Sequence, residues 1–320
     1  MPTILHSAQE AADRLREGCN VALPTETVYG LAGLVSQEAA VRNIFALKNR
    51  PQSHPLIMHI APDWDIRQWV SEVPEYAQKL IDNCWPGPLT LVLPCRTEVI
   101  PALVNAGQDS IALRVPSHPL TLEVLRLCKG PIVAPSANPF GKVSPTTAEH
   151  VAQSFADTSL YILDGGRCKV GIESTIVSAL HPKSWRILRP GMLDVEKIQE
   201  LTGLAEVVEE DATKVPGRLP QHYQPNTPLY YFDSQEALER FYHSFDGELF
   251  LMTAHKPAGH PEHLYAAFPE DPQQAAWALY YQLRIADESS AQGIIICLPE
   301  DSEKNQGIRE RIKKAGQAPV

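Results

Sequence analysis

The chain lacks the features of several protein classes. Its 28 Lys and Arg are outnumbered by 38 Asp and Glu, and the net charge of -10 argues against an extended nucleic-acid-binding surface. No uninterrupted apolar run approaches the roughly 20 residues that span a bilayer. The N-terminus has neither the basic start nor the apolar core of a signal peptide. We therefore expect a cytoplasmic protein with no membrane partner, in which a local basic pocket can still bind a polyphosphate.

Paired cysteines are also missing. No CxxC occurs, and no histidine lies at zinc-ligand spacing from a cysteine pair. We expect reduced core or loop thiols and no metal ligand directly from the protein. The six scattered cysteines are Cys19, Cys84, Cys95, Cys128, Cys168 and Cys297.

The 320 residues favour two domains, each with its own core. The first two-thirds alternate helix and strand signals, with too many strands for a strictly parallel sheet. We expect an α/β fold with a twisted mixed sheet and helices. Strands are predicted at 21–23, 56–60, 89–93, 110–115, 131–134, 160–163, 175–180 and 185–188. Helices are predicted from Ser7 to Gly18 and at 37–47, 75–83, 120–128, 148–155 (capped by Thr146) and 195–201.

The composition changes near residue 205. After the acidic Glu209-Glu210-Asp211, four prolines between residues 214 and 228 favour an extended, semi-rigid path. A pure spacer does not need the His222-Tyr223 pair, so this segment has something to contact. The remainder indicates a smaller α/β unit, with strands at 229–232, 249–252 and 293–298 and helices at 275–286 and 309–314. The predicted domains are 1–205 and 229–320, joined by a Pro-rich linker or lid at 206–228.

Four short polar clusters lie between strands that should be buried. They are Pro24–Leu31, Lys48–Pro51, Ala134–Pro139 and Gly171–Ile176. Arg50 offers a fixed fork of hydrogen-bond donors and Lys48 a mobile point charge. This pair is the best suited to bind a polyphosphate, and Ser136 and Asn138 can add neutral hydrogen bonds. Loops held by a rigid scaffold commonly carry chemistry. The four clusters therefore predict one lined cavity.

These clusters, followed by Asp164-Gly165-Gly166 and Leu188–Gly191, resemble in order the pattern of the YrdC-type threonylcarbamoyl-AMP synthases. The linker with His222-Tyr223 and the small C-terminal unit resemble the family's longer, two-domain branch. The resemblance implies a YrdC-like catalytic domain and a Rossmann-like C-terminal domain. It also implies a reaction in which L-threonine and bicarbonate form a carbamate, which attacks the α-phosphate of ATP. Threonylcarbamoyl-AMP and pyrophosphate result, for threonylcarbamoyladenosine modification of tRNA.

The resemblance also implies roles for individual residues. The expected catalytic set is Lys48, Arg50, Ser136 and Asn138. The expected ATP contacts are Arg50, His54, Ser110, Ser136, Ser144, Arg189 and Tyr223. The expected threonine contacts are Thr27, His59, Arg114, Ala134 and Ser174. Mg2+ should arrive with ATP, and a downstream tRNA threonylcarbamoyl-transfer enzyme should be a transient partner, with weak or no direct tRNA binding.

Each site residue also has a simpler interpretation. Lys48 and Arg50 could form an exposed helix C-terminus, and Ser136 with Asn138 could build a turn. His59 could be a satisfied core histidine. Thr27 could be an ordinary strand residue, Arg114 half of a surface pair and Arg189 the cap of a strand. Tyr223 could anchor the linker without reaching the site.

The sequence departs from the family pattern at three places. Asn49 stands where the family usually has Gly, and His54 where Asn is common. Pro220-Gln221 replace the basic residues that usually precede the His-Tyr pair.

Two other functions stay open: an RNA-binding or ribosome-assembly module of the same fold, and a carbamoyltransferase domain of the hydrogenase-maturation type. The acidic balance argues against the first, and the absence of zinc-finger-like Cys clusters against the second.

Overall fold

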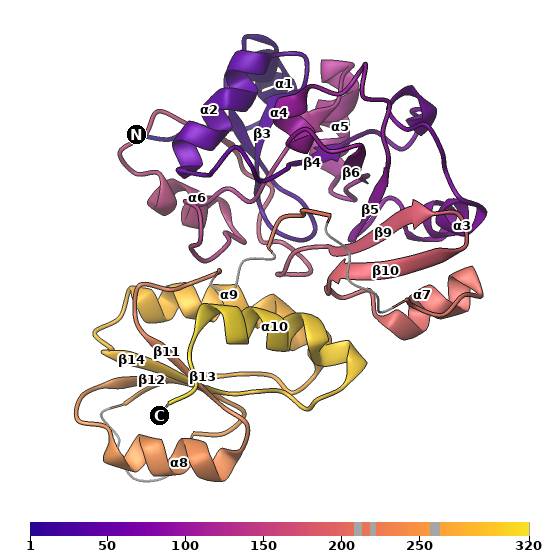
Figure 1. Ribbon diagram of the computed structural model, residues 1–320. Coiled ribbons are helices and arrows are strands. Elements are labelled where there is room, and N and C mark those ends of the chain that lie inside the picture. The colour runs from indigo at the N-terminus through magenta and orange to yellow at the C-terminus, as the bar shows by residue number, and fades with distance from the viewer. Residues whose placement is uncertain (208–212, 218–221, 257–262, 320) are drawn as a thin grey trace.

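The computed structural model describes residues 1–207, 213–217, 222–256 and 263–319. Two sheets organise these residues, a ten-stranded one formed by residues 3–189 and a four-stranded one formed by residues 229–297 (Figure 1). The predicted α/β fold is confirmed. The predicted features Glu209-Glu210-Asp211 and Pro220-Gln221 lie outside the described residues.

The larger sheet has the order β1-β8-β2-β3-β7-β4-β6-β5-β9-β10 and mixes parallel with antiparallel pairs, as the strand count of the sequence predicted. Its strands are β1 (Thr3–Leu5), β2 (Val21–Leu23), β3 (Gly30–Leu34), β4 (Ile57–His59), β5 (Leu89–Pro94), β6 (Ser110–Arg114), β7 (Ile132–Val133), β8 (Tyr161–Leu163), β9 (Thr175–His181) and β10 (Ser184–Arg189). The central strands are buried on both faces, which explains their continuous apolar runs.

The helices of this first unit are α1 (Ala8–Arg16), α2 (Glu38–Lys48), α3 (Glu75–Cys84), α4 (Ala102–Asn105), α5 (Pro119–Cys128), α6 (Ala148–Ser154) and α7 (Val195–Thr202). Local signals explain several boundaries. The Ser7 hydroxyl accepts a hydrogen bond from the Glu10 backbone at the start of α1, as predicted. The cap predicted at Thr146 is wrong by one residue, because the Thr147 hydroxyl accepts the bond from the His150 backbone.

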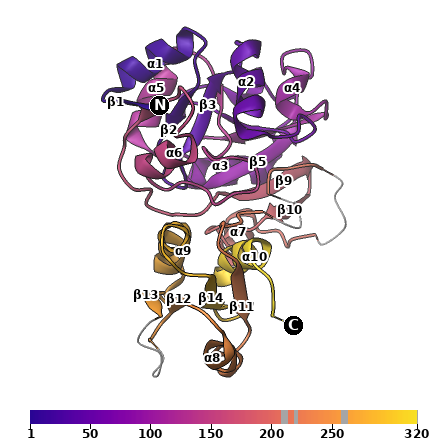
Figure 2. The same cartoon turned by 90° about the vertical axis from the view of Figure 1, so that its left-hand side faces the viewer.

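The smaller sheet is parallel, with the order β11-β14-β12-β13. Its strands are β11 (Leu229–Phe232), β12 (Leu249–Thr253), β13 (Leu264–Ala267) and β14 (Gly293–Cys297); its helices are α8 (Gln235–Ser244), α9 (Pro272–Asp287) and α10 (Gln306–Ala315). Figures 1 and 2 show α9 and α10 between this sheet and the first unit, with α8 on the opposite face. The junction is therefore made by two helices of the C-terminal unit.

The prediction omitted β1, β3, α4, α8 and β13. Among the described residues, no helix is long and apolar enough to cross a membrane. None of the six cysteines forms a disulfide, and all six are at least half-buried. The interdomain segment, where described, forms neither helix nor strand.

Candidate active site

The Lys48-Asn49-Arg50 turn brings two cations to the end of α2. Asn49 has φ 51°, a left-handed conformation, and the backbone N–H groups of Asn49 and Arg50 return to Ala46 and Phe45 carbonyls. Asn and Gly adopt this conformation more easily than other residues, so Asn49 is compatible with this turn. The tight turn directs Arg50 back over the rim of the sheet.

Arg50 is buried but incompletely bonded. Its Nη2 donates to the Pro55 carbonyl at 2.9 Å, whereas its Nε has no protein partner among the described residues. Burial lowers the pKa of Arg50 to about 10, so it stays charged at neutral pH. A charged side chain with a donor to spare is suited to an anionic ligand.

Lys48 is tied in place and is not the mobile charge expected from the sequence. Its Nζ lies 2.5 Å from each of two carbonyl oxygens, those of Ser136 and Asn138. The exposed helix-end interpretation fails for Lys48, which is 2% exposed. Burial, with the charge of Arg50, holds the pKa of Lys48 well below its ordinary value. Lys48 therefore fixes the 136–138 loop and brings its amino group to the cavity wall.

Strands β4 and β6 supply the floor of the cavity. They pair in parallel, with His59 opposite Arg114, and alternation places Ile57 and Ala112 on the same face, two residues earlier. The Arg114 guanidinium donates to Glu26 at 2.6 Å, a buried ion pair. Burial, with the neighbouring charge of Arg114, lowers the pKa of His59 to about 3, so the ring is neutral at pH 7.

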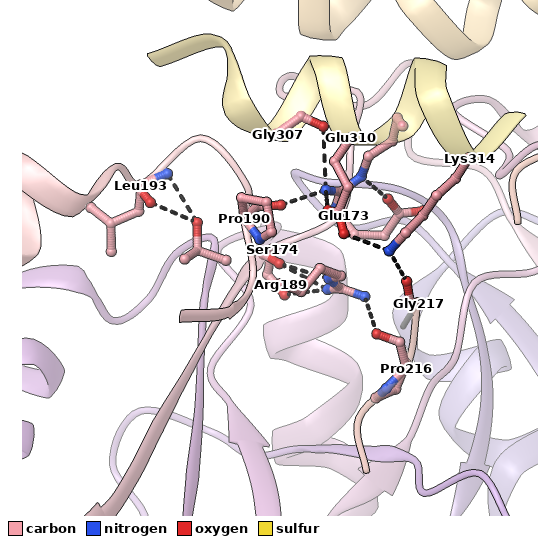
Figure 3. Close-up of polar contacts among 12 residues, drawn as sticks. Glu173, Ser174, Arg189, Pro190, Leu193, Pro216, Gly217, Gly307, Glu310 and Lys314 are labelled. Atoms are coloured by element: carbon pink, nitrogen blue, oxygen red, sulfur yellow. Dashed lines mark hydrogen bonds and ion pairs between the residues drawn. The ribbon is translucent and has the colours of Figure 1, made fainter. Parts of the chain in front are cut away.

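The opposite wall comes from the Glu173-Ser174 turn and the end of β10. Figure 3 shows Arg189 beside Ser174, with its guanidinium directed toward Pro216 of the linker. Arg189 donates to the Ser174 carbonyl at 2.8 Å and to the Ser174 hydroxyl at 3.1 Å. It also reaches the Pro216 carbonyl at 3.5 Å. Arg189 thus links the strand, the turn and the linker, and it does more than cap a strand.

The linker covers the cavity. Pro216, Gly217, His222 and Tyr223 all line it. Gly217 has φ +87°, and a Cβ there would lie 2.6 Å from the Tyr223 hydroxyl, so only glycine fits this approach. Tyr223 is 1% exposed with φ 64°, and its ring stacks on Tyr280 of α9. Tyr223 both lines the cavity and anchors the linker, but it anchors to the C-terminal unit.

Most residues predicted for the site converge. Eleven line one cavity: Thr27, Lys48, Arg50, His59, Arg114, Ala134, Ser136, Asn138, Ser174, Arg189 and Tyr223. Three predicted ATP contacts do not line it. Ser144 is fully buried with its hydroxyl donating to Glu173, and Ser110 begins β6, four residues before Arg114. His54 is half-buried against Phe140, a ring that does line the cavity.

Charged and aromatic residues at the cavity were missed by the sequence analysis. Glu173 lines the cavity and Glu26 pairs with Arg114 beside it; both lie inside clusters that were recognised, but charged residues beside threonine or serine carried no separate signal. Phe140 follows the Ala134–Pro139 cluster directly. Its ring lies between those of His54 and His222, and the Arg50 guanidinium lies 5.5 Å from its centre. The missed residues are thus neighbours in sequence of the predicted ones.

The charges of the cavity favour anions. Lys48, Arg50, Arg114 and Arg189 line it together with one carboxylate, that of Glu173. The Glu26 carboxylate lies beside the cavity, paired with Arg114. Among the described residues, three of these cations have no carboxylate within ion-pair distance; only Arg114 is paired, with Glu26. No group of three or more His, Cys, Asp or Glu suited to a metal occurs in this part of the chain. The fold and the cavity define an α/β enzyme that acts on strongly anionic substrates.

Comparisons with known proteins identify the family. The Sua5/YciO/YrdC family model, described as telomere recombination, matches residues 13–191, and a model for the C-terminal domain of threonylcarbamoyl-AMP synthase matches residues 193–316. The chain belongs to the threonylcarbamoyl-AMP synthase family, in its two-domain form.

Its relatives agree with both matches. The chain is 36% identical to the threonylcarbamoyl-AMP synthase of Bacillus subtilis, over 96% of this chain and 92% of that one. It is 43% identical to that of Pyrococcus abyssi, over 68% of this chain and 66% of the relative. The crystal structure of P. abyssi Sua5 complexed with L-threonine matches with a TM-score of 0.86 at 32% identity, over 98% of this chain and 97% of that one. Nothing in these comparisons favours the RNA-binding alternative.

Proposed function

We propose that this enzyme makes threonylcarbamoyl-AMP from L-threonine, bicarbonate and ATP. The amine of threonine and bicarbonate form a carbamate with loss of water. A carbamate oxygen then attacks the α-phosphorus of ATP, and the bond to the β-phosphate breaks to release pyrophosphate. The product serves tRNA threonylcarbamoyladenosine modification.

The observation that carries the proposal is the set of three cations left without carboxylate partners, Lys48, Arg50 and Arg189. Attack on ATP brings the charges of a triphosphate, a carboxylate and a carbamate together, and fixed cations in a water-poor site offset that repulsion. Buried polar atoms without partners in the described part of the chain add capacity for a polar ligand. These are Arg50 Nε, Asn138 Oδ1 and His222 Nδ1, each on a cavity-lining residue.

The Arg114 end of the cavity supports a small amino acid beside the nucleotide. A guanidinium can hold a carboxylate in two parallel hydrogen bonds. Arg114 already meets Glu26, so we propose that the threonine carboxylate shares this guanidinium, while the neutral His59 ring orients the amine or carbamate. Thr27, which hydrogen-bonds Thr25 at 2.8 Å, is the proposed partner of the substrate hydroxyl.

Mg2+ is expected on the phosphates of ATP. Glu173, which lines the cavity, is already engaged by a serine, a tyrosine and an arginine. Glu26, the partner of Arg114, is engaged by that arginine and by the Ser117 backbone. Such occupied carboxylates fit poorly as metal ligands. The protein's contribution is therefore its cations, and the ion enters with the substrate.

The linker is proposed as a lid that excludes water from the carbamate and from the mixed anhydride product, both of which water destroys. Product transfer requires that the lid open. We propose a downstream tRNA-modifying enzyme as the transient recipient, because the net charge of -10 argues against a broad basic surface for tRNA.

The deciding experiment combines the protein with ATP, L-threonine, bicarbonate and Mg2+ and measures pyrophosphate and an AMP-linked product. Both should appear only when threonine and bicarbonate are present. Arg50→Ala should lower turnover by about a hundredfold or more, the usual cost of losing a charge that stabilises a transition state. The exposed Arg42 of α2, the helix that leads into the Arg50 turn, serves as a matched control, and Arg42→Ala should behave as the wild type. Pyrophosphate release that is unchanged without threonine would reject the proposal.

A further inference from the structure

Glu173 is held by both units of the molecule. Its Oε1 accepts a hydrogen bond from Ser144 at 2.6 Å, within the first unit. Its Oε2 accepts from the Tyr280 hydroxyl at 2.9 Å and from Arg311 Nε at 3.2 Å. Tyr280 lies on α9 and Arg311 on α10, more than 100 residues away along the chain. A carboxylate in the cavity wall thus depends on the C-terminal unit for its counter-ion.

Arg311 is placed with little freedom. Its side chain is fully buried, and its Nη1 donates to the Pro190 carbonyl just beyond β10, to the Gly307 carbonyl at 3.3 Å and to the Glu310 carboxylate at 2.9 Å. Glu310 has a second cation in Lys314, whereas Arg311 is the one ion-pair partner of Glu173 among the described residues. A Cβ on Gly307 would lie 2.8 Å from the Gly191 carbonyl, so α10 sits directly on this turn of the first unit. Figure 3 shows α10 over Pro190 and Glu173, with Gly307 and Glu310 facing them. The helix cannot move away without releasing Arg311 from the turn.

The charge of Glu173 matters for the cavity. Burial alone would raise its pKa, but Arg311, Arg189 and the Ser144 hydroxyl outweigh burial and lower the pKa to about 2. Glu173 is therefore ionised at neutral pH. It also interacts electrostatically with Lys48 and Arg189, two of the three cations without carboxylate partners. Without Arg311, this carboxylate would offset part of the positive charge that faces the ligand.

We propose that Arg311 is a positioning residue for the active site: it neutralises Glu173 from α10 and so preserves the positive field of Lys48, Arg50 and Arg189 for phosphates. The C-terminal unit then has a second role besides carrying one end of the linker, because it completes the electrostatics of the cavity. This inference rests on the proposed function in assigning phosphates as the ligand. Its test below needs no turnover.

The test uses full-length variants and measures binding of inorganic tripolyphosphate by calorimetry at pH 7.5. Arg311→Met removes the charge and should weaken binding about tenfold or more, because it leaves a buried carboxylate unpaired beside the anion. Arg311→Lys retains the charge and should stay within about threefold of the wild type. The double variant Arg311→Met/Glu173→Gln removes both charges and should recover affinity to within about threefold.

Arg309 provides the matched control, because it lies on the same helix but pairs with Asp301 and the Pro299 carbonyl. Arg309→Met should bind tripolyphosphate as the wild type does. Equal affinity of Arg311→Met and Arg309→Met would overturn the inference. A folded double variant that binds about tenfold more weakly than the wild type would do the same, because the loss would then come from packing. If Arg311→Met alone fails to fold, the double variant decides.

The same proteins separate this inference from the proposed function. Threonine-dependent pyrophosphate release by the wild type tests the function, and tripolyphosphate affinity tests Arg311. If the wild type binds tripolyphosphate but releases no pyrophosphate, the proposed function is rejected. The role of Arg311 is then still decided by the tripolyphosphate affinities of the variants. A wild type that binds no tripolyphosphate would overturn the inference directly.

Discussion

Lowering the pH should destabilise this protein because His59 is protonated in the unfolded chain but not in the folded protein. This effect should occur at a higher pH than the titration of the carboxylates. His59 lies in the cavity floor with 2% of its surface exposed, and its Nδ1 is 3.2 Å from the Ile57 carbonyl. Arg114 and Glu26 are the charged groups that act on it. Burial and the Arg114 charge disfavour the protonated ring. The folded protein therefore keeps His59 neutral at a pH where the unfolded chain takes up a proton.

The magnitude follows from the two pKa values. The ordinary value for histidine is 6.5 and that of folded His59 is about 3. Because the folded pKa is lowered, its contribution to the free energy of unfolding is complete above pH 6.5 and is lost as the pH falls toward 3. Between pH 7 and pH 5 the loss is about 2 kcal/mol. Burial also lowers the pKa of His222 to about 3, so its contribution to the free energy of unfolding is lost over the same range.

The interval from pH 7 to pH 5 separates the effect of the histidines on stability from that of the carboxylates. Glu26 and Glu173 also have lowered pKa values, but their stabilisation is lost mainly below 4.5, the ordinary value for a glutamate. Urea unfolding followed by tryptophan fluorescence at pH 7 and pH 5 gives the change in free energy of unfolding. The wild type should lose about 2 kcal/mol more than His59→Gln over this interval.

His181 is the control, because it is exposed at the end of β9. His181→Gln should lose as much stability between pH 7 and pH 5 as the wild type. If His59→Gln loses as much as the wild type, His59 must be protonated in the folded protein. The argument from burial would then be wrong.

Three further predictions follow from single contacts. Asn49→Val should lower the free energy of unfolding by about 1–2 kcal/mol in urea titration, because a β-branched residue resists positive φ; no change would contradict the assigned turn. Arg114→Met should cost about 3–5 kcal/mol by the same measurement, because it leaves Glu26 buried without its cation; a variant as stable as the wild type would show that the carboxyl is protonated or hydrated. Lys314→Met should raise the KM for ATP severalfold, because Lys314 Nζ donates to a linker carbonyl at 2.5 Å. Lys313→Met, at the exposed neighbouring residue, should leave that KM unchanged. Equal KM values for the two variants would show that the contact of Lys314 with the linker does not affect ATP binding.

The sequence predicted best those elements whose signals are local. The helices predicted from Ser7 to Gly18 and at 37–47 are read within a few residues, and both are confirmed as α1 and α2 with boundaries shifted by one or two residues. Strand β3 (Gly30–Leu34) was missed because Gly, Leu and Ala are not typical strand residues. A Cβ on Gly30 would lie 3.0 Å from the Ala134 Cβ, so close approach of the neighbouring chain favours glycine there. Tertiary packing overrode strand propensity, and no local pattern records that.

The polar clusters predicted where the cavity is but not how its charges are paired. Arg114 bonds Glu26 across 88 residues, and Arg311 bonds Glu173 across 138. Nothing in a cluster of eight residues identifies a partner at such a distance. The predicted mobility of Lys48 failed for the same reason, because the two carbonyls that hold it belong to a loop about 90 residues away.

The overall charge of -10 and the cationic cavity are compatible because opposite charges are distributed unevenly. Several ion pairs among the described residues are exposed i,i+3 or i,i+4 contacts, such as Arg14–Glu17 and Arg42–Glu38, and contribute little to the field inside. The buried pairs act differently, since one neutralises Glu173 in the cavity wall and the other neutralises Glu26 beside it. Lys48, Arg50 and Arg189 then act in a low-dielectric space without neutralisation by carboxylates in the described part of the chain. The charge count argues against an extended basic surface, whereas the positive interior depends on the long-range pairing of Glu26 and Glu173.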